Sequence, residues 1–186
     1  MVAKIPDNGL NITDLAAADD FSLTSDGAVI NFGADGEIKL THVADTGLAL
    51  KHTATADDKP IVLTLQTGET DMAADDVIGK IAFQAPDEGT GTDAILVSAA
   101  IQAVAEGNHS SSSNATSLQF MTGASEAAAS KMTLSSSGLL TVSGRIITDD
   151  TTAATSTTDG SLQTDGGLSV ALDAVVVDDL YLKSDA

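Results

Sequence analysis

The sequence predicts an elongated all-β protein of short antiparallel strands and tight turns, and three observations lead to this prediction. Apolar and polar residues alternate in short runs, most clearly across residues 19–51, and a period of two is typical of half-buried strands. Polar turns at residues 25–27, 33–36 and 45–47 separate these runs. Aromatic residues make up only 3% of the chain, and tryptophan is absent. Large side chains supply most of the burial in a globular core, so we expect the core to be completed by oligomerisation.

The chain is expected to divide into five parts along its length, because composition changes at each boundary. Acidic loops, polar low-complexity loops and glycine-containing turns separate the alternating runs. The expected parts are residues 1–18, an N-terminal lead-in or attachment segment; 19–66, a first β module; 67–148, a second β module; 149–167, a polar linker or run of turns; and 168–186, the start of a repeated β module.

The alternation predicts where the strands lie. In the first module, Phe21 and Leu23 are expected to share one strand face, and Ile38 and Leu40 another. Residues 48–50 and 61–65 form further apolar runs that we interpret as strands, and the alternation resumes at residues 168–182. The expected strands of the second module lie around residues 77–84, 118–120, 132–134 and 140–142.

Residues 93–106 fit two structures. Their alanine content and the leading Asp93 favour a helix, whereas Ile95, Val97 and Ile101 alternate with small or polar residues. We favour a strand because the surrounding sequence is strand-like.

The first module has an echo near the other end of the chain. Residues 19–26 (DDFSLTSD) match residues 178–185 (DDLYLKSD) at both leading aspartates, the Leu, the Ser and the final Asp. Long-range similarity of this kind indicates modular architecture. The offset of 159 residues (178 − 19) predicts one whole module followed by the first strand of the next, so we expect the natural chain to continue past Ala186.

Charge and cysteine content exclude several functions. Eight Lys and Arg against 27 Asp and Glu give a net charge of −19, which opposes binding to nucleic acid and to anionic membrane surfaces and favours solubility. The absence of cysteine excludes disulfides and thiol chemistry. Residues 1–7 lack the apolar stretch of a signal peptide, and no run is long enough to span a membrane.

Most of the chain after residue 19 resembles phage tail fibres and related virion fibre proteins. The similar segments are Gly79-Lys80-Ile81-Ala82-Phe83, residues 89–91 and 94–107, Ser110-Ser111-Ser112-Ser113, residues 118–123 (LQFMTG) and residues 131–142 (KMTLSSSGLLTV). Residues 30–50 and 158–170 resemble repeats in structural proteins of marine phages.

This resemblance implies an intertwined homotrimer, either a β-prism or an arrangement like a fibre shaft. It implies other virion proteins as partners and a host surface glycan as a further partner. The protein would assemble in the host cytoplasm and end in the tail or another external fibre of the virion. One departure from this resemblance is that no stretch up to Ala186 resembles the chaperone-like C-terminal domain of such fibres.

Carboxylates and histidines are the candidates for chemistry. Adjacent aspartates on a strand point to opposite faces, so no doublet forms a catalytic pair; we interpret the doublets as solvated turn acids. They are Asp19/Asp20, Asp57/Asp58, Asp75/Asp76, Asp149/Asp150 and Asp178/Asp179. His42 is expected on the same strand face as Ile38 and Leu40, so one His42 from each of three chains could surround a metal ion at a trimer axis. None of His42, His52 and His109, however, has a second candidate ligand at a useful spacing. We predict no catalytic residue, no metal site and no cofactor.

Asn11, Asn108 and Asn114 fit the glycosylation pattern, which occurs easily by chance. The polar loops at residues 85–93 and 107–116 are candidate receptor-contact surfaces, because loops on a rigid scaffold often carry recognition. The interpretation that we favour, however, is that both loops merely decorate a shaft. The receptor-binding residues themselves are not predicted. The favoured function is a structural fibre that mediates host attachment. The alternatives are a head or neck fibre or decoration protein without a receptor role, a cell-surface filament or S-layer-like protein, and an enzyme that degrades capsule.

Overall fold

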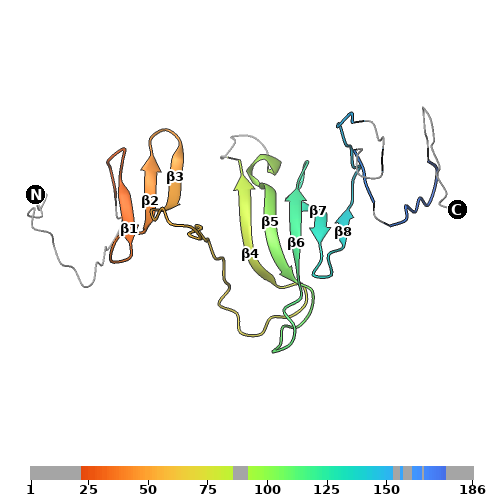
Figure 1. Ribbon diagram of the computed structural model, residues 1–186, viewed down its shortest axis with the longest axis horizontal. Coiled ribbons are helices and arrows are strands. Elements are labelled where there is room, and N and C mark those ends of the chain that lie inside the picture. The colour runs from red at the N-terminus through yellow and green to blue at the C-terminus, as the bar shows by residue number, and fades with distance from the viewer. Residues whose placement is uncertain (1–21, 86–91, 153–155, 157–160, 165, 175–186) are drawn as a thin grey trace, which may run out of the picture. The chain divides into compact units, whose positions relative to one another are not determined.

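The computed structural model describes residues 22–85, 92–152, 156, 161–164 and 166–174. Within them the protein is all-β, with two antiparallel sheets and a single three-residue 3₁₀ turn (Figure 1). The predicted all-β class with antiparallel strands is therefore confirmed. The predicted echo between residues 19–26 and 178–185 lies largely outside the described residues. The chain divides into two compact units, Met1–Thr64 and Leu65–Ala186, and each is considered by itself.

The first unit holds a three-stranded meander. Its strands are β1 (Val29–Phe32), β2 (Ile38–Val43) and β3 (Gly47–His52), hydrogen-bonded in that order. The predicted turns are present: Gly33 and Gly36 adopt positive φ in the β1–β2 turn, and Asp45 does so in the β2–β3 turn. A Cβ at Gly33 would overlap the Glu37 carboxylate, which explains the glycine at this position.

The second unit holds a five-stranded meander. Its strands are hydrogen-bonded in sequence order (Figure 1), and they are β4 (Val77–Gln84), β5 (Val97–Ala105), β6 (Thr116–Thr122), β7 (Ala129–Leu134) and β8 (Leu140–Val142). Neighbours in sequence are neighbours in the sheet because short loops join antiparallel strands directly.

The structure confirms the strand that was predicted within residues 93–106. The 3₁₀ turn η1 (Asp93–Ile95) occupies only the first three of them, and β5 takes Val97–Ala105. The helix-favouring alanines sit in the middle of the sheet, between β4 and β6, where pairing on both sides decides the conformation.

Three predicted strands are not formed by the residues that the structure describes. Residues 61–65 form no strand, and neither does Leu23 or the described part of the last run, residues 168–174. Phe21 and residues 175–182 lie outside the described residues. The alternation in these runs indicates which side chains share a face, but a strand also needs a neighbour to pair with. Pro60 also removes a main-chain donor at the start of the 61–65 run.

Each sheet has one apolar face. In the five-stranded sheet, cross-strand partners form two apolar rows that run across every strand. One row is Ile81, Ile101, Phe120, Met132 and Val142, and the other is Gly79, Ala103, Leu118, Leu134 and Leu140. In the three-stranded sheet, Ile30, Leu40 and Leu50 form the corresponding row.

The opposite face of the five-stranded sheet is mixed, because a polar row lies between Ala82, Ala100 and Met121 on one side and Val104 on the other. Between the two apolar rows runs a third row of Lys80, Gln102, Gln119, Thr133 and Thr141, whose side chains point the other way. The Gln102 amide Nε2 donates to Gln119 Oε1 at 3.0 Å. This hydrogen bond satisfies both amides in part and pins the register of the two central strands.

Very little of either sheet is buried. Among the described residues the buried hydrophobic side chains are Ala100, Val104, Ala105 and Ala128, so the largest is a valine. On the apolar face of the second sheet, by contrast, Ile81 and Phe83 are 45% and 53% exposed. An antiparallel sheet normally packs its apolar face against another layer, and no described element supplies that layer here.

Leu65, which lies outside the strands, packs onto this apolar face. It lines a shallow hollow of about 170 Å³ together with Gly79, Ile81, Ile101, Gln102, Ala103 and Leu118. A Cβ built on Gly79 would stand 2.8 Å from the Leu65 Cβ. The missing side chain at Gly79 therefore makes room for Leu65, which explains why the run ends in an apolar residue without forming a strand.

Replacing Gly79 with alanine tests this contact. Because the φ angle of Gly79 is not in the left-handed region, Gly79→Ala should lower the free energy of unfolding by about 1–3 kcal/mol through overpacking alone. Chemical denaturation measures this cost.

Two further variants serve as controls for Gly79→Ala. In a Leu65→Gly background the cost of Gly79→Ala should largely vanish, because the atoms it collides with are gone. Gly68→Ala should be nearly neutral, since nothing lies within 4 Å of a Cβ there. Equal costs at Gly68 and Gly79 would contradict the assigned contact.

Candidate functional site

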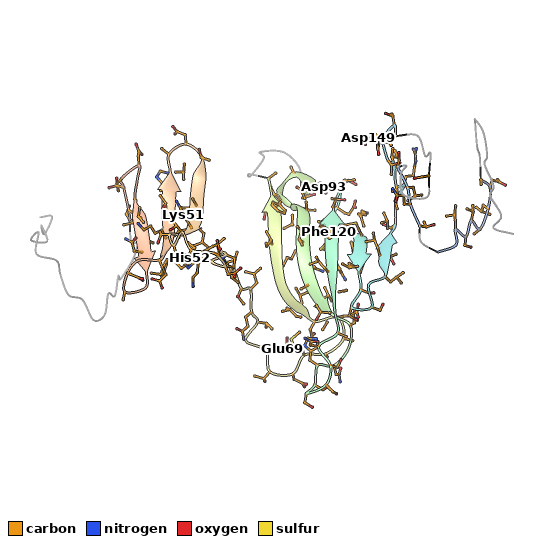
Figure 2. The ribbon with its side chains drawn as sticks, in the orientation of Figure 1. Lys51, His52, Glu69, Asp93, Phe120 and Asp149 are labelled. Atoms are coloured by element: carbon orange, nitrogen blue, oxygen red, sulfur yellow. The ribbon has the colours of Figure 1, made fainter. Side chains whose placement is uncertain are left out.

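The strongest candidate for a functional site is the serine-rich end of the five-stranded sheet. At this end β4 begins, β5 ends, β6 begins, β7 ends and β8 begins, so the connections 72–76, 106–115 and 135–139 gather there. The seven serines of the last two connections are Ser110, Ser111, Ser112, Ser113, Ser135, Ser136 and Ser137. In Figure 2, Glu69 lies at this end of the sheet and Asp93 at the opposite end.

The loop between β5 and β6 is held by its own hydrogen bonds. The Ser110 and Ser113 main chains bond to each other in both directions, at 2.8 and 3.4 Å. The Thr116 hydroxyl donates to the Asn114 carbonyl at 2.9 Å. The His109 Nε2 lies 3.4 Å from the Ala115 carbonyl oxygen. The loop is thus a defined turn that presents exposed serine hydroxyls.

Glu106 joins this loop to the β7–β8 turn. Its Oε1 accepts from the Ser136 N–H at 3.0 Å, and its Oε2 accepts from the Ser136 hydroxyl. These two bonds, the hydroxyl first, hold the pKa of the Glu106 carboxyl below its usual range because both stabilise the charged form. The β7–β8 turn itself closes through Gly138, whose N–H donates to Ser135 O at 3.0 Å and whose φ is +81°.

The segment before β4 is tied to the same end. The His109 N–H donates to Met72 O at 3.0 Å, and the Asp75 N–H donates to Ala105 O at 2.9 Å. The Asp76 Oδ2 accepts from the Ala73 N–H at 2.6 Å. Three connections therefore form one hydrogen-bonded rim, and its exposed surface offers hydroxyls, amides and main-chain groups. Such a surface can bind polar, uncharged ligands such as sugars through hydrogen bonds.

The other predicted contact loop lies at the opposite end of the sheet. Of residues 85–93 the structure describes only Ala85, Thr92 and Asp93, so the loop cannot be compared with the rim. Near it, the Gln84 Nε2 donates to the Ile95 carbonyl at 2.7 Å, which fixes the end of β4 against η1. The ends of β4 and β5 that flank this loop therefore lie opposite the end of the sheet that carries the rim.

The aspartate doublets that are described lie outside the strands. Asp58 and Asp75 adopt positive φ, which aspartate tolerates better than most residues. The Asp150 carboxylate accepts from the Thr152 hydroxyl at 2.7 Å and its N–H at 3.1 Å. These bonds hold the pKa of Asp150 below its usual range, with the Thr152 hydroxyl as the largest cause. Asp19/Asp20 and Asp178/Asp179 lie outside the described residues.

Two of the three histidines, His42 and His52, lie in the strands of the first unit, and the third, His109, lies in the rim. His42 shares a face with Ile38 and Leu40, as predicted, and lines an apolar hollow of about 220 Å³ with Leu23, Ala28, Ile30, Leu40 and Leu48. The His52 Nδ1 accepts from the Ala54 N–H at 3.1 Å. His109 belongs to the β5–β6 loop.

No group of three or more His, Asp or Glu side chains within the described residues is placed to hold a metal ion. In the same part of the chain, no helix has the length and apolarity that crossing a bilayer requires. Asn108 and Asn114 both lie in the rim, and Asn11 lies outside the described residues.

Comparison with family models, curated proteins and solved structures gave no match to this chain. The function is therefore argued from the geometry above.

Sequence reasoning identified the serine-rich loop but missed Glu106, which holds the rim together. Glu106 and Ser136 are 30 residues apart in sequence, and only the meander topology brings them into contact. A prediction of the β5–β6 and β7–β8 connections at one end would have placed both residues there, but a lone glutamate at a strand end carries no distinguishing signal.

The Glu106–Ser136 link predicts a titration. A folded pKa below the ordinary value of 4.5 means that the link is fully present above pH 4.5 and is lost as the pH falls through the folded pKa. The Ser136 amide resonance should therefore shift with pH in an NMR titration, with a midpoint below 4.5. The shift should disappear in Glu106→Gln and persist in Glu69→Gln; a midpoint above 4.5 would contradict the link.

Proposed function

We propose that this chain is a structural fibre protein of a phage particle, a homotrimeric shaft or adhesion module that attaches the particle to its host's surface. The observation that carries the proposal is the pair of one-layer sheets with uncovered apolar faces, in a chain whose largest buried hydrophobic side chain among the described residues is Val104. Such a chain needs copies of itself to complete a core. Repeated modules with tight turns are suited to a mechanical element, and they match the resemblance to tail fibres.

Attachment through such a fibre would depend on the number of contacts. A single sugar contact with a Kd near ~1 mM contributes only about 4 kcal/mol. Three chains in each fibre, and several fibres on each particle, raise the avidity by roughly 10²–10⁴ without any improvement in a single contact. The proposal therefore requires only a shallow polar surface. It assigns no catalytic step to the chain, and release of reducing ends from host polysaccharide would contradict that part.

Within the rim, the connections 106–115 and 135–139 form the surface that we assign to host contact. Ser111 and Ser112 are exposed, and the loop that holds them is fixed by Glu106 and by the Ser110–Ser113 pair. A fixed loop loses little conformational freedom on binding. It therefore suits weak, repeated contact with a glycan.

A second function, a head or neck fibre without a receptor role, is favoured by one observation. Many polar groups of the rim are bonded to one another, including the Ser135 and Ser137 hydroxyls at 2.8 Å and the Glu106 carboxylate with Ser136. Groups satisfied internally are less available to a ligand, so the rim would then serve only to terminate the sheet.

Immunogold labelling of intact particles that carry the gene for this chain tests the virion assignment. We expect the label at the tail or at another external fibre. Label confined to the head or neck would support the second function, and particles free of the protein would rule out both.

A competition experiment separates host contact from a purely structural role. Purified chain added to host cells should reduce particle adsorption, and Ser111→Trp should abolish this effect by blocking the rim. Ala124→Trp, an exposed position in the β6–β7 connection at the other end of the sheet, is the matched control and should compete normally. Equal competition by the two variants would exclude the rim as the contact surface.

A further inference from the structure

We infer that the apolar face of the β4–β8 sheet is the contact surface between copies of this chain, with three copies turning that face toward a common axis. The inference deepens the proposed homotrimer by naming the surface that holds it together. It rests on the composition of the face, on its exposure and on its area.

The composition of the face suits burial. Its two apolar rows contain only glycine, alanine and larger hydrophobic residues, although the chain as a whole carries a net charge of −19. The polar row, with Lys80 at its edge, points the other way. Copies that meet through the apolar face would bury no charge from these rows, and their acidic groups would remain in solvent.

The exposure of the face shows that the described residues of the second unit leave it uncovered. Phe83, Leu134 and Leu140 are 53%, 41% and 55% exposed. Leu65 covers only the hollow beside Gly79. Figure 2 places Phe120 on β6, the middle strand of this sheet, and no described layer lies over it. A contiguous apolar surface of this kind marks an interaction site.

The area of the face is sufficient for contact between copies. Five strands spaced ~4.8 Å apart and about six residues long at ~3.3 Å per residue give a face of roughly 480 Å². Two such faces packed together would bury about 960 Å² in total, close to the ~1,000 Å² that a specific interface needs. Three faces around one axis would bury the same ~480 Å² from each copy, and the number three rests on the proposed homotrimer.

The proposal also explains the small residues of the face. Ala99 lies beside Phe83 in the pairing of β4 with β5, and Ala103 lies beside Gly79 and Leu118. Alternation of small and large side chains across a face leaves hollows that side chains of a facing copy can fill. The hollow of about 170 Å³ beside Leu65 is one of them.

Two double variants test the surface. Phe83→Glu with Leu140→Glu places two charges on the apolar face, at exposed positions on both edge strands. Ala82→Glu with Thr141→Glu is the matched control, because it adds the same charge to exposed neighbours on the same strands, which point to the opposite face. Circular dichroism checks that both variants keep the strands.

The readout is the molar mass in solution. The unmodified chain and the control should sediment at about three times 18.7 kDa, and the face variant at 18.7 kDa. Raising the salt concentration should strengthen the unmodified trimer, because an apolar contact persists while repulsion between the acidic chains is screened.

Several results would overturn the inference. They are a monomeric or dimeric unmodified chain, a face variant that stays trimeric, dissociation of both variants, or assembly only with a different virion protein. The outcome is separable from that of the virion assignment, since a trimer held by this face but absent from particles would refute the proposed function and leave the inference standing.

Discussion

Within each unit, the described residues place no second layer over the sheet, and this is the constraint on which the rest of the structure depends. A sheet one layer thick exposes both faces, and burial of apolar area is the main favourable term in folding. Here the described part of one copy buries nothing larger than Val104. The main-chain hydrogen bonds of the two meanders define the strands, but they cannot substitute for a core, because their net contribution is small once the loss of bonds to water is counted.

Several other features of the chain keep such a thin sheet soluble and ordered. Lys80 on the edge strand β4 and the adjacent glutamine pair keep one face soluble. Tight turns with Gly33, Gly138 and Asp45 in positive φ leave little loop to order. The Glu106–Ser136 link ties two connections together at one end. Local hydrogen bonds thus order the strands and connections within one copy. The apolar faces are left to hold the copies together in the proposed trimer.

The fold class, the turns and the strands of the second module were predictable from the sequence, because alternation and glycine are local signals. Pairing is not local. Residues 61–65 alternate like a strand, yet Leu65 packs over Gly79, and the sequence carries no sign of which strand edge is available. The rim was half predictable: the serine run is visible in the sequence, whereas the contact of Glu106 with Ser136 depends on which strand ends meet.

Distances between copies test the central claim most directly. The chain has no cysteine, so a single spin label can be attached through Met132→Cys on the apolar face or through Thr133→Cys beside it on the opposite face. Pulsed electron paramagnetic resonance then measures the separation of labels in different copies. The account predicts a shorter separation for the label at position 132 than for the one at position 133. A longer separation at position 132, or no measurable coupling at either position, would contradict it.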